Sequence, residues 1–534
     1  MWFPSLGRMA CKGGLALISA TTLDKDLQSV QEMRRAVARA KEAQERFATY
    51  SQEEVDRIVE AMAEAAYQKA HELAQMAVEE TGLGVVEHKV IKNQVAAKDV
   101  YESIKGVRTV GIVHEDKEKQ IIEVASPFGV IAGIVPTTNP TSTAIFKSLI
   151  AVKARNAIVF SPHPHAAKCT VEAAKVCLEA AKAAGAPDGL IGWISQPTME
   201  ATEGLLKHPD VHLILATGGS GLVRAAYSSG KPAYGVGPGN VPVYIEKSAD
   251  IPQAVRHIVD SKTFDNGTIC ASEQAVIVDQ QVRHLVVQQF KKQGAYFLNE
   301  QEKKKVEQII SPVPGQLNPK IVGKSAQKIA EMAGIRVPAN TRLLIADEKE
   351  IGQDFPFSIE KLSPLFAFYT VKDWQEAIDK AIKLLALGGK GHTLALHTRD
   401  DSIARRFLEA IPVSRLVVNS PAALGAVGAT THLDPSFTLG CGTFGGNITS
   451  DNITVHHLLN KKRLAYGYRD LDIPPPGSAK NQNRVAAVGG KVFKEQEEVR
   501  KVVEKVLKEE GKIGYVDQEL VTQLVNDVLS KIKA

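Results

Sequence analysis

Short apolar runs that alternate with helix-forming stretches limit the fold of this chain more than any other feature of its sequence. The runs contain almost no charged residues, which is typical of strands buried on both faces of a parallel sheet. They are FGVIAGIVP (128–136), AIVFSP (157–162), LIGWIS (190–195), VHLILAT (211–217), PVYIE (242–246), AVIV (275–278), LALH (394–397) and RLVVN (415–419). Strands and helices in this order predict an α/β fold with two doubly wound domains.

The length of 534 residues requires more than one hydrophobic core. We expect the first domain over residues 25–106 and 126–244 and the second over 245–430. Residues 107–125 place two β-rich runs around the charged turn HEDKEK, which predicts a long hairpin. Residues 1–24 are interpreted as an N-terminal extension that need not be ordered.

Composition and charge exclude several classes of protein. A net charge of +5 is small for this length, so we expect no nucleic-acid partner. No apolar run is long enough to span a membrane, and Gly13 and Gly14 interrupt the weak apolar patch near the N-terminus that a signal peptide would need. The five cysteines are scattered and form no C-x-x-C pair, so we expect no metal site and a reducing, cytoplasmic compartment.

One cysteine lies in a sequence context that favours chemistry. FDNGTICASEQ (264–274) places Cys270 between a glycine-containing turn and the strand AVIV, where we expect it to be exposed at a strand edge within a cleft. The alternative is a small buried hydrophobic residue. That alternative is the better interpretation for Cys169 and Cys177, which lie on an alanine-rich stretch. For Cys441 in GCGTFGG two interpretations stay open, a packing residue or a residue that lines a pocket.

Two loops after apolar strands are candidates for ligand binding. Gly218, Gly219 and Ser220 follow VHLIL and open into a helix, where backbone N–H groups can approach a phosphate. The spacing is not G-x-G-x-x-G, so a plain strand-to-helix turn explains it equally well. Asn139 lies in VPTTNPTST, where its amide could donate to an oxyanion or form an Asx-turn with Pro140.

Taken together, several segments resemble the aldehyde dehydrogenase superfamily, and specifically its coenzyme-A-acylating branch. They occur in order over about residues 25–465: PFGVIAGIVPTTNPTSTAIFKSL, SPHP, ATGGSG, GVGPGN, FDNGTICASEQ, EKLSPL and TLGCGTFGGN. The resemblance implies a nicotinamide-binding domain, which is the first of the two, and a catalytic domain around Cys270. It also implies a β-arm for oligomer assembly, formed by residues 107–125 and 431–469, and hence a homodimer or homotetramer.

The resemblance also assigns roles to residues. It implies that Cys270 is the nucleophile, that Asn139 is a donor of the oxyanion hole, and that Glu360 in EKLSPL holds the nicotinamide ribose. Gly218, Gly219 and Ser220 lie where the family binds the cofactor phosphate. Ser161 and His163, in Ser161-Pro162-His163, replace the Lys-Pro-Ser-Glu of the hydrolytic enzymes, so NAD is favoured and NADP stays open.

A second departure from the hydrolytic enzymes concerns the acceptor of the acyl group. Those enzymes carry a glutamate about 35 residues before the cysteine that activates water as a general base, whereas this chain has GVGPGN (235–240) there. Without that base, a thiol competes better than water for the thioester. We therefore expect coenzyme A to take the acyl group of a small aldehyde, acetaldehyde or propionaldehyde. The alternatives are a hydrolytic aldehyde dehydrogenase and a catalytically silent cargo or scaffold protein.

The C-terminal residues extend beyond this resemblance. Residues 470–494 contain the proline-rich and polar stretch IPPPGSAKNQNR and are interpreted as a linker. Residues 495–534 predict helices, and DQELVTQLVNDVLSKI has one apolar stripe. This tail resembles the encapsulation peptides that bring acylating aldehyde dehydrogenases to the shell proteins of bacterial microcompartments. The alternative is a tail that docks on its own catalytic domain or on a neighbouring subunit.

Overall fold

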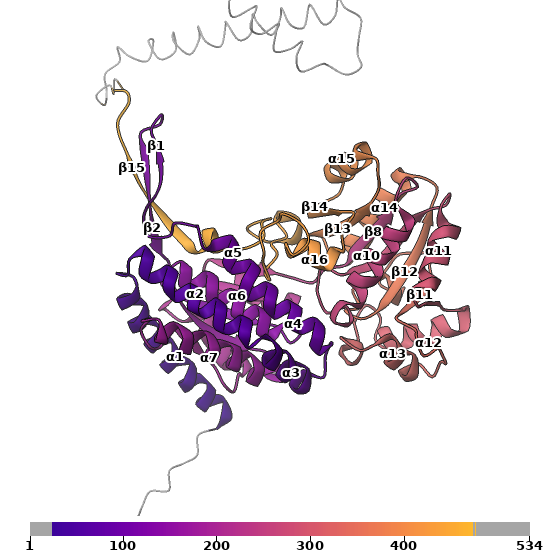
Figure 1. The fold of residues 1–534 in the computed structure, drawn as a ribbon, viewed down its shortest axis with the longest axis horizontal. Helices are drawn as coiled ribbons and strands as arrows, with labels where there is room; N and C mark the ends of the chain where they lie inside the picture. Colours follow the sequence, from indigo (N-terminus) through magenta and orange to yellow (C-terminus); the bar gives the residue numbers. More distant parts are fainter. Residues whose placement is uncertain (1–23, 472, 474–475, 477–534) are drawn as a thin grey trace, which may run out of the picture. The chain divides into compact units, whose positions relative to one another are not determined.

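The computed structural model describes residues 24–471, 473 and 476, and the chain divides into two units, residues 1–464 and 465–534. The extension expected at residues 1–24 lies outside the described residues except for Asp24. The linker and tail expected over 470–534 likewise lie outside them, apart from four residues. Both parallel sheets belong to the first unit (Figure 1).

The first sheet is fully parallel and has the strand order β5-β4-β3-β6-β7. The chain builds outward from β3 to β5 and then returns to place β6 beside β3, which creates a topological switch point between these two strands. Its strands are β3 (Val130–Val135), β4 (Ala157–Pro162), β5 (Ile191–Trp193), β6 (Val211–Thr217) and β7 (Ala233–Val236).

Helices cover this sheet because its strands are apolar along their length. Every residue of β3 and β4 is buried, so both faces need a layer of packed side chains. α6 packs on β3 and β4, α7 packs on β4 and β5, and α1 lies against β3, β4 and β5. The helices of this part are α1 (Lys25–Phe47), α2 (Gln52–Gln68), α3 (Ala70–Thr81), α4 (Val86–Gln94), α5 (Val100–Ile104), α6 (Pro140–Lys153), α7 (Ala167–Ala183), α8 (Met199–Lys207) and α9 (Ser220–Tyr227).

The second sheet is also parallel and has the order β10-β11-β12-β9-β8-β13-β14. Alternate residues of its strands enter two separate cores: Val276 of β9 joins one core, and Ile277 joins the other. The strands are β8 (Val241–Ile245), β9 (Glu273–Asp279), β10 (Ala295–Phe297), β11 (Leu343–Asp347), β12 (Leu365–Val371), β13 (Gly391–His397) and β14 (Val413–Val418).

The helices around the second sheet lie between its strands in the sequence, except α16, which follows β14. α10 and α11 contribute to the core that contains Val276, and α14 contributes to the core that contains Ile277. The α/β class with two parallel sheets, expected from the apolar runs, is confirmed. The helices are α10 (Ile251–Thr263), α11 (Arg283–Lys292), α12 (Glu300–Ile310), α13 (Ala326–Met332), α14 (Trp374–Ala386), α15 (Asp401–Ala410) and α16 (Ala422–Ala426).

The predicted hairpin is confirmed and belongs to a third, small sheet. β1 (Gly111–Asp116) pairs antiparallel with β2 (Ile121–Pro127), and β15 (Leu459–Ala465) lies on the other side of β2. Glu123 of β2 bonds to Lys461 and Arg463 of β15. This sheet projects away from the helices around the five-stranded sheet (Figure 1). In the part of the chain that is described, no helix is long and apolar enough to cross a membrane.

Candidate active site

The chain places several chemically capable side chains at one edge of the seven-stranded sheet. Gly239 lies just before β8, Cys270 before β9, Glu360 before β12, and His392 is the second residue of β13. These four strands are neighbours in the order β12-β9-β8-β13 and run parallel, so their amino ends lie at the same edge. β9 is an interior strand, so the expectation of a cysteine at a strand edge was wrong.

A histidine contacts the sulfur of Cys270. His392 Nε2 lies 3.2 Å from Cys270 Sγ, and the other ring nitrogen, Nδ1, lies 2.9 Å from the Thr393 hydroxyl. Gly239 makes this approach possible, because a Cβ atom there would lie 2.2 Å from the Cys270 carbonyl oxygen and 3.3 Å from the His392 ring. The result is a cysteine–histidine pair of the kind that supports nucleophilic catalysis.

Both members of this pair are neutral at physiological pH. Burial, and next the Glu360 carboxylate, raise the pKa of the Cys270 thiol to about 12. Burial, with a smaller effect of Arg415, lowers the pKa of His392 to about 3. When the imidazole proton is on Nδ1 and is donated to the Thr393 hydroxyl, Nε2 is the acceptor and the Cys270 thiol donates to it.

Glu360 is the acidic group that acts most strongly on Cys270. Its Oε1 accepts a hydrogen bond of 2.8 Å from the Gly239 backbone N–H, which ties this carboxylate to the GVGPGN loop. Burial raises the pKa of Glu360 to about 7, against the opposing effect of the Gly239 N–H. Glu360 therefore lies beside the cysteine, and the Gly239 N–H already occupies one of its oxygens.

Arg415 and Cys441 complete this side of the site. The Arg415 guanidinium donates to the carbonyl oxygens of His392 (3.1 Å) and Gly440 (2.6 Å), so it joins the histidine loop to the GCGTFGG loop. Cys441 is buried, packs in the same small apolar cluster as Ile269 and Ala271, and also raises the pKa of Cys270. Cys441 is thus both a packing residue and a neighbour of the candidate nucleophile.

The turn before Cys270 has an unusual backbone. Asp265 and Asn266 have φ angles of 50° and 52°, and Gly267 follows at 74°, so three successive residues are left-handed. Two of the three are not glycine, and such strain persists only where other contacts hold it. The fully buried Asp265 accepts from the Val85 N–H (2.7 Å), from Lys89 (2.9 Å) and from Lys92. The Lys92 and Lys89 ammonium groups overcome the effect of burial and lower the pKa of Asp265 to about 2.

Asn139 lies at the carboxyl end of β3, as the N-cap residue of α6 with Pro140 in the first turn. Its side chain accepts no hydrogen bond from a backbone N–H of the helix, so the structure does not contain the Asx-turn that was the alternative for Asn139 and Pro140. Instead, Oδ1 accepts from Lys92 Nζ at 2.5 Å, and Nδ2 donates to the Thr138 hydroxyl at 3.1 Å. Through Lys92, which also bonds to Thr268, Asn139 is connected to the turn before Cys270.

The residues expected to hold a cofactor lie at the carboxyl ends of the five-stranded sheet. Gly218 and Gly219 join β6 to α9, which begins at Ser220 beside the switch point. A Cβ atom on Gly219 would meet no atom within 4 Å, and Gly219 caps α9 without a side chain, so the helix N-terminus is open to a phosphate. An open helix N-terminus beside the switch point of a parallel sheet fits the phosphates of a dinucleotide. Glu360, the other residue expected to hold the cofactor, lies before β12 of the seven-stranded sheet.

Ser161 and His163 lie at the end of the neighbouring strand β4. The Ser161 hydroxyl is buried and pairs with the Thr202 hydroxyl at 2.8 Å, so it already has a partner. His163 is exposed, and its Nδ1 accepts from the His165 N–H at 3.2 Å. Of these two residues, His163 is therefore the one free to approach a ligand.

Sequence reasoning missed His392 and Lys92. His392 lies in GGKGHT, where three glycines precede a histidine at the start of a buried strand, and this context is a weak but usable signal. Lys92 lies on α4 in a stretch that reads as an ordinary polar helix. Nothing in the sequence near Lys92 indicates that its ammonium group meets a turn more than 170 residues away.

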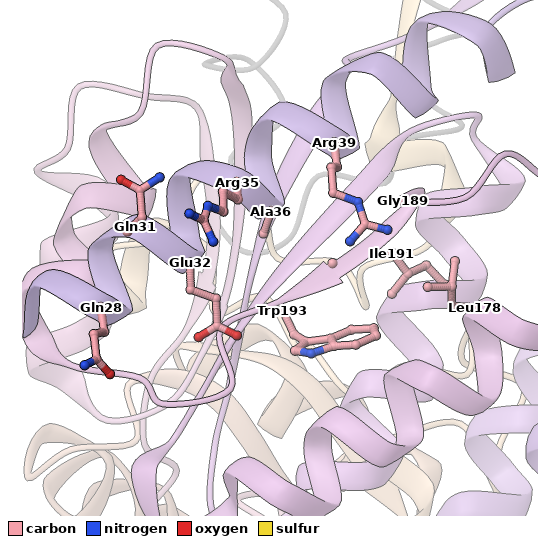
Figure 2. A pocket seen from close by; sticks show the side chains of 11 residues that line it. Gln28, Gln31, Glu32, Arg35, Ala36, Arg39, Leu178, Gly189, Ile191 and Trp193 are labelled. Carbon is pink, nitrogen blue, oxygen red and sulfur yellow. The ribbon is translucent and has the colours of Figure 1, made fainter. Parts of the chain in front are cut away.

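Two further features are distinct from this site. A groove of about 400 Å³ lies between α1 and β5, where Glu32, Arg35, Arg39 and Trp193 line it (Figure 2). It contains no cysteine or histidine and none of the residues described above. Within residues 24–471, no cluster of three or more His, Cys, Asp or Glu side chains is placed to hold a metal ion.

The fold and the site define a class: an α/β protein with two parallel sheets and a cysteine–histidine pair of the kind found in nucleophilic enzymes. Comparison with known families is more specific. The model of the aldehyde dehydrogenase family matches residues 21–329, which is more than half of the chain. The chain belongs to the aldehyde dehydrogenase family.

Individual proteins agree with this assignment. A solved acetylating aldehyde dehydrogenase from Geobacillus thermoglucosidasius is 59% identical, with a TM-score of 0.83 over 84% of this chain and 100% of that chain. A propionaldehyde dehydrogenase from Rhodopseudomonas palustris, solved with bound CoA and an acylated cysteine, is 29% identical, with a TM-score of 0.74 over 81% of this chain and 97% of that one. The bifunctional aldehyde-alcohol dehydrogenase of Escherichia coli is 50% identical over 442 residues, 82% of this chain. This chain spans about half the length of that curated relative, of which 50% is covered.

Proposed function

We propose that this chain oxidises a short aldehyde, acetaldehyde or propionaldehyde, with NAD and transfers the acyl group from Cys270 to coenzyme A. One observation carries the proposal. The Cys270 sulfur lies 3.2 Å from a neutral histidine, while Glu360, the carboxylate that acts on it most, is bonded to the Gly239 N–H. The site therefore has a proton acceptor for a thiol, and the GVGPGN loop supplies no carboxylate to activate water.

The first step forms a bond between Cys270 Sγ and the aldehyde carbon. As the sulfur attacks, the thiol proton passes to His392 Nε2, and the carbonyl oxygen gains a negative charge. Asn139 Nδ2 and the Cys270 backbone N–H are the donors proposed for this oxyanion. Removing one such donor typically slows a reaction by about 10²–10³.

The second step turns the thiohemiacetal into a thioester. A nicotinamide, when bound, would supply the acceptor for the hydride of the former aldehyde carbon. His392 then releases to solvent the proton that it took from Cys270, so it is neutral again before the third step. Gly218, Gly219 and Ser220 would hold its phosphates and Glu360 its ribose. His163 follows β4, which β3 separates from β6. We propose NAD as the cofactor. NADP is the alternative, and His163 is the residue proposed to determine which of the two is bound.

The third step moves the acyl group to a second sulfur. The coenzyme A thiol attacks the thioester carbon and gives its proton to neutral His392, and the tetrahedral oxyanion collapses to expel the Cys270 thiolate. The thiolate then takes the proton back from His392, so the site returns to its starting state. A thiol is far more acidic than water, so it competes well where no general base activates water.

Hydrolytic turnover is the rival, with Glu360 as the base for water. NADH formation from propionaldehyde should be limited to about one equivalent per site without coenzyme A and become continuous when it is added. The product should be propionyl-CoA, identified by mass spectrometry. Continuous formation of propionate in the absence of coenzyme A would show that this chain is hydrolytic.

We also propose that the chain forms a homodimer or homotetramer through the arm of β1, β2 and β15. Support comes from the exposure of this three-stranded sheet, which has no buried face on β1 or β15. A sheet of this size needs a hydrophobic face or a packing partner for stability.

For the location of the protein, we propose the cytoplasm, inside a bacterial microcompartment, with residues 513–534 bound to shell proteins. The apolar stripe of this tail and its resemblance to encapsulation peptides support the proposal. Deletion of residues 513–534 should leave kcat and KM within about twofold, because the segments that carry the resemblance end before the tail, and should abolish co-purification with shell proteins. Retention of the shell proteins by the truncated chain would contradict the proposal.

A further inference from the structure

The ammonium group of Lys92 joins three separate parts of the molecule. Lys92 lies on α4, and its side chain is almost fully buried. Nζ donates to Asn139 Oδ1 at 2.5 Å, to the carboxylate of Asp265, and to the Thr268 hydroxyl at 3.0 Å. Asn139 belongs to the five-stranded sheet, whereas Asp265 and Thr268 belong to the turn that leads to Cys270.

These contacts determine which way the Asn139 amide faces. An ammonium group has three protons and no lone pair, so it can only donate. The Asn139 atom that faces Lys92 must therefore be the carbonyl oxygen, and the NH₂ group points elsewhere. One N–H of Nδ2 bonds to the Thr138 hydroxyl at 3.1 Å, which leaves the second N–H for a ligand.

We propose that Lys92 is a positioning residue that holds the Asn139 amide so that Nδ2 is presented as a donor to the oxyanion on Cys270. This inference rests on the proposed function, because it needs Asn139 to act in that step. The same ammonium group also bonds to Asp265 in the turn before Cys270, but Lys89 shares that contact, whereas the bond to Asn139 is made by Lys92.

A neighbouring lysine provides a matched control. Lys89 lies one helical turn earlier on α4, is equally buried, and bonds to the same Asp265 oxygen at 2.9 Å. Its remaining bond is to the Thr138 carbonyl at 2.9 Å, and the described part of the chain shows no bond from Lys89 to Asn139. Loss of Lys89 therefore removes a buried charge beside the same turn and leaves the bond between Lys92 and Asn139 Oδ1 in place, while it frees the Thr138 carbonyl.

The experiment is a pair of double-mutant cycles on the full chain, with Lys92→Met, Lys89→Met and Asn139→Ala singly and in combination. The readout is the rate of the first NADH burst with propionaldehyde, before coenzyme A is added. Asn139→Ala should slow the burst by about 10²–10³, as expected for loss of an oxyanion donor. Lys92→Met should slow it by about tenfold or more, with little change in the half-saturating aldehyde concentration, because only transition-state binding is lost.

The combinations decide the question. In the Asn139→Ala background, Lys92→Met should have almost no further effect, whereas the factor for Lys89→Met should multiply with that of Asn139→Ala. Multiplying factors for Lys92 would overturn the inference and assign this lysine to the turn alone. A normal burst in Lys92→Met would also overturn it. Lys92→Gln, which keeps one donor and no charge, replaces Lys92→Met in both cycles if the methionine variant does not fold.

A failure of the proposed function has a different signature. If Asn139→Ala keeps the wild-type burst rate, Asn139 is not an oxyanion donor and the inference falls with that assignment. The need for coenzyme A in continuous turnover is measured separately and does not depend on this result. The two failures are therefore distinguishable.

Discussion

Cys270 and His392 form a neutral pair in the resting protein, and this sets the reactivity of the thiol. The burial that raises the pKa of Cys270 to about 12 also lowers that of His392 to about 3. A thiolate–imidazolium pair would need the opposite shifts. In the proposed reaction, the attacking thiolate would therefore form only as the proton moves to His392.

This state predicts how Cys270 responds to pH. Between pH 7 and 10 the thiolate fraction rises about tenfold per pH unit, because the pKa lies above this range. Alkylation of Cys270 by iodoacetamide, followed by mass spectrometry of the intact protein, should accelerate accordingly, without a plateau. Cys270→Ser corrects for alkylation of the other cysteines. A plateau near neutral pH would show that the resting state is an ion pair.

The sequence singled out Cys270 and Glu360, which lie in recognisable motifs. It did not single out His392 or Lys92, which come from distant parts of the chain. Cys270 and Glu360, which the motifs singled out, both precede strands at the same sheet edge, and the Glu360 carboxylate raises the pKa of Cys270. His392 contacts the cysteine across 122 positions of sequence, and Lys92 contacts Asp265 across 173. Such contacts depend on strand order and helix placement, which local patterns do not encode.

At the scale of elements, glycines allow the loops before the central strands to pack closely. A Cβ atom on Gly391 would lie 2.0 Å from the Cys441 carbonyl oxygen, and Gly391 has a φ of 81°. Nearby Gly388 is exposed and would meet no atom within 4 Å. The two glycines are close in sequence, yet only one is required by the packing of the site.

This contrast gives a second test. Gly391→Ala should destabilise the protein by about 1–3 kcal/mol through backbone strain, with an added cost for the clash. It should also lower kcat, because His392 is the next residue. Gly388→Ala should stay within about 0.5 kcal/mol of wild type. Thermal unfolding and the coenzyme-A-dependent NADH assay measure both effects, and equal behaviour of the two variants would refute this account of the loop.

The elements with strong apolar signals were predicted closely from the sequence. AIVFSP coincides with β4 (Ala157–Pro162), and VHLILAT coincides with β6 (Val211–Thr217). The strand order β12-β9-β8-β13 was not predictable, because it depends on crossovers between strands that are far apart in the chain. That order brings the loops with Cys270 and His392 together, so the fold class was accessible from the sequence and the site geometry was not.

At the scale of the whole molecule, the sheet of β1, β2 and β15 has no core of its own. Ile112 on β1 is 48% exposed and Leu464 on β15 is 47% exposed. β1 and β15 are the two edges of this sheet, so both present unpaired backbone groups. Exposed apolar side chains beside unpaired edges are characteristic of a surface that meets another chain.

The proposed assembly therefore predicts that charge on this sheet will separate the subunits. Ile112→Glu combined with Leu464→Glu places two carboxylates where apolar side chains would meet a second copy, and burying an unpaired charge is costly. Light scattering after gel filtration should show the wild type as a dimer or tetramer and the double variant at the mass of one chain. Lys462→Ser, at an exposed polar position of the same strand, should leave the oligomer intact. If the double variant keeps the wild-type mass while remaining folded by circular dichroism, the subunits do not associate through this sheet.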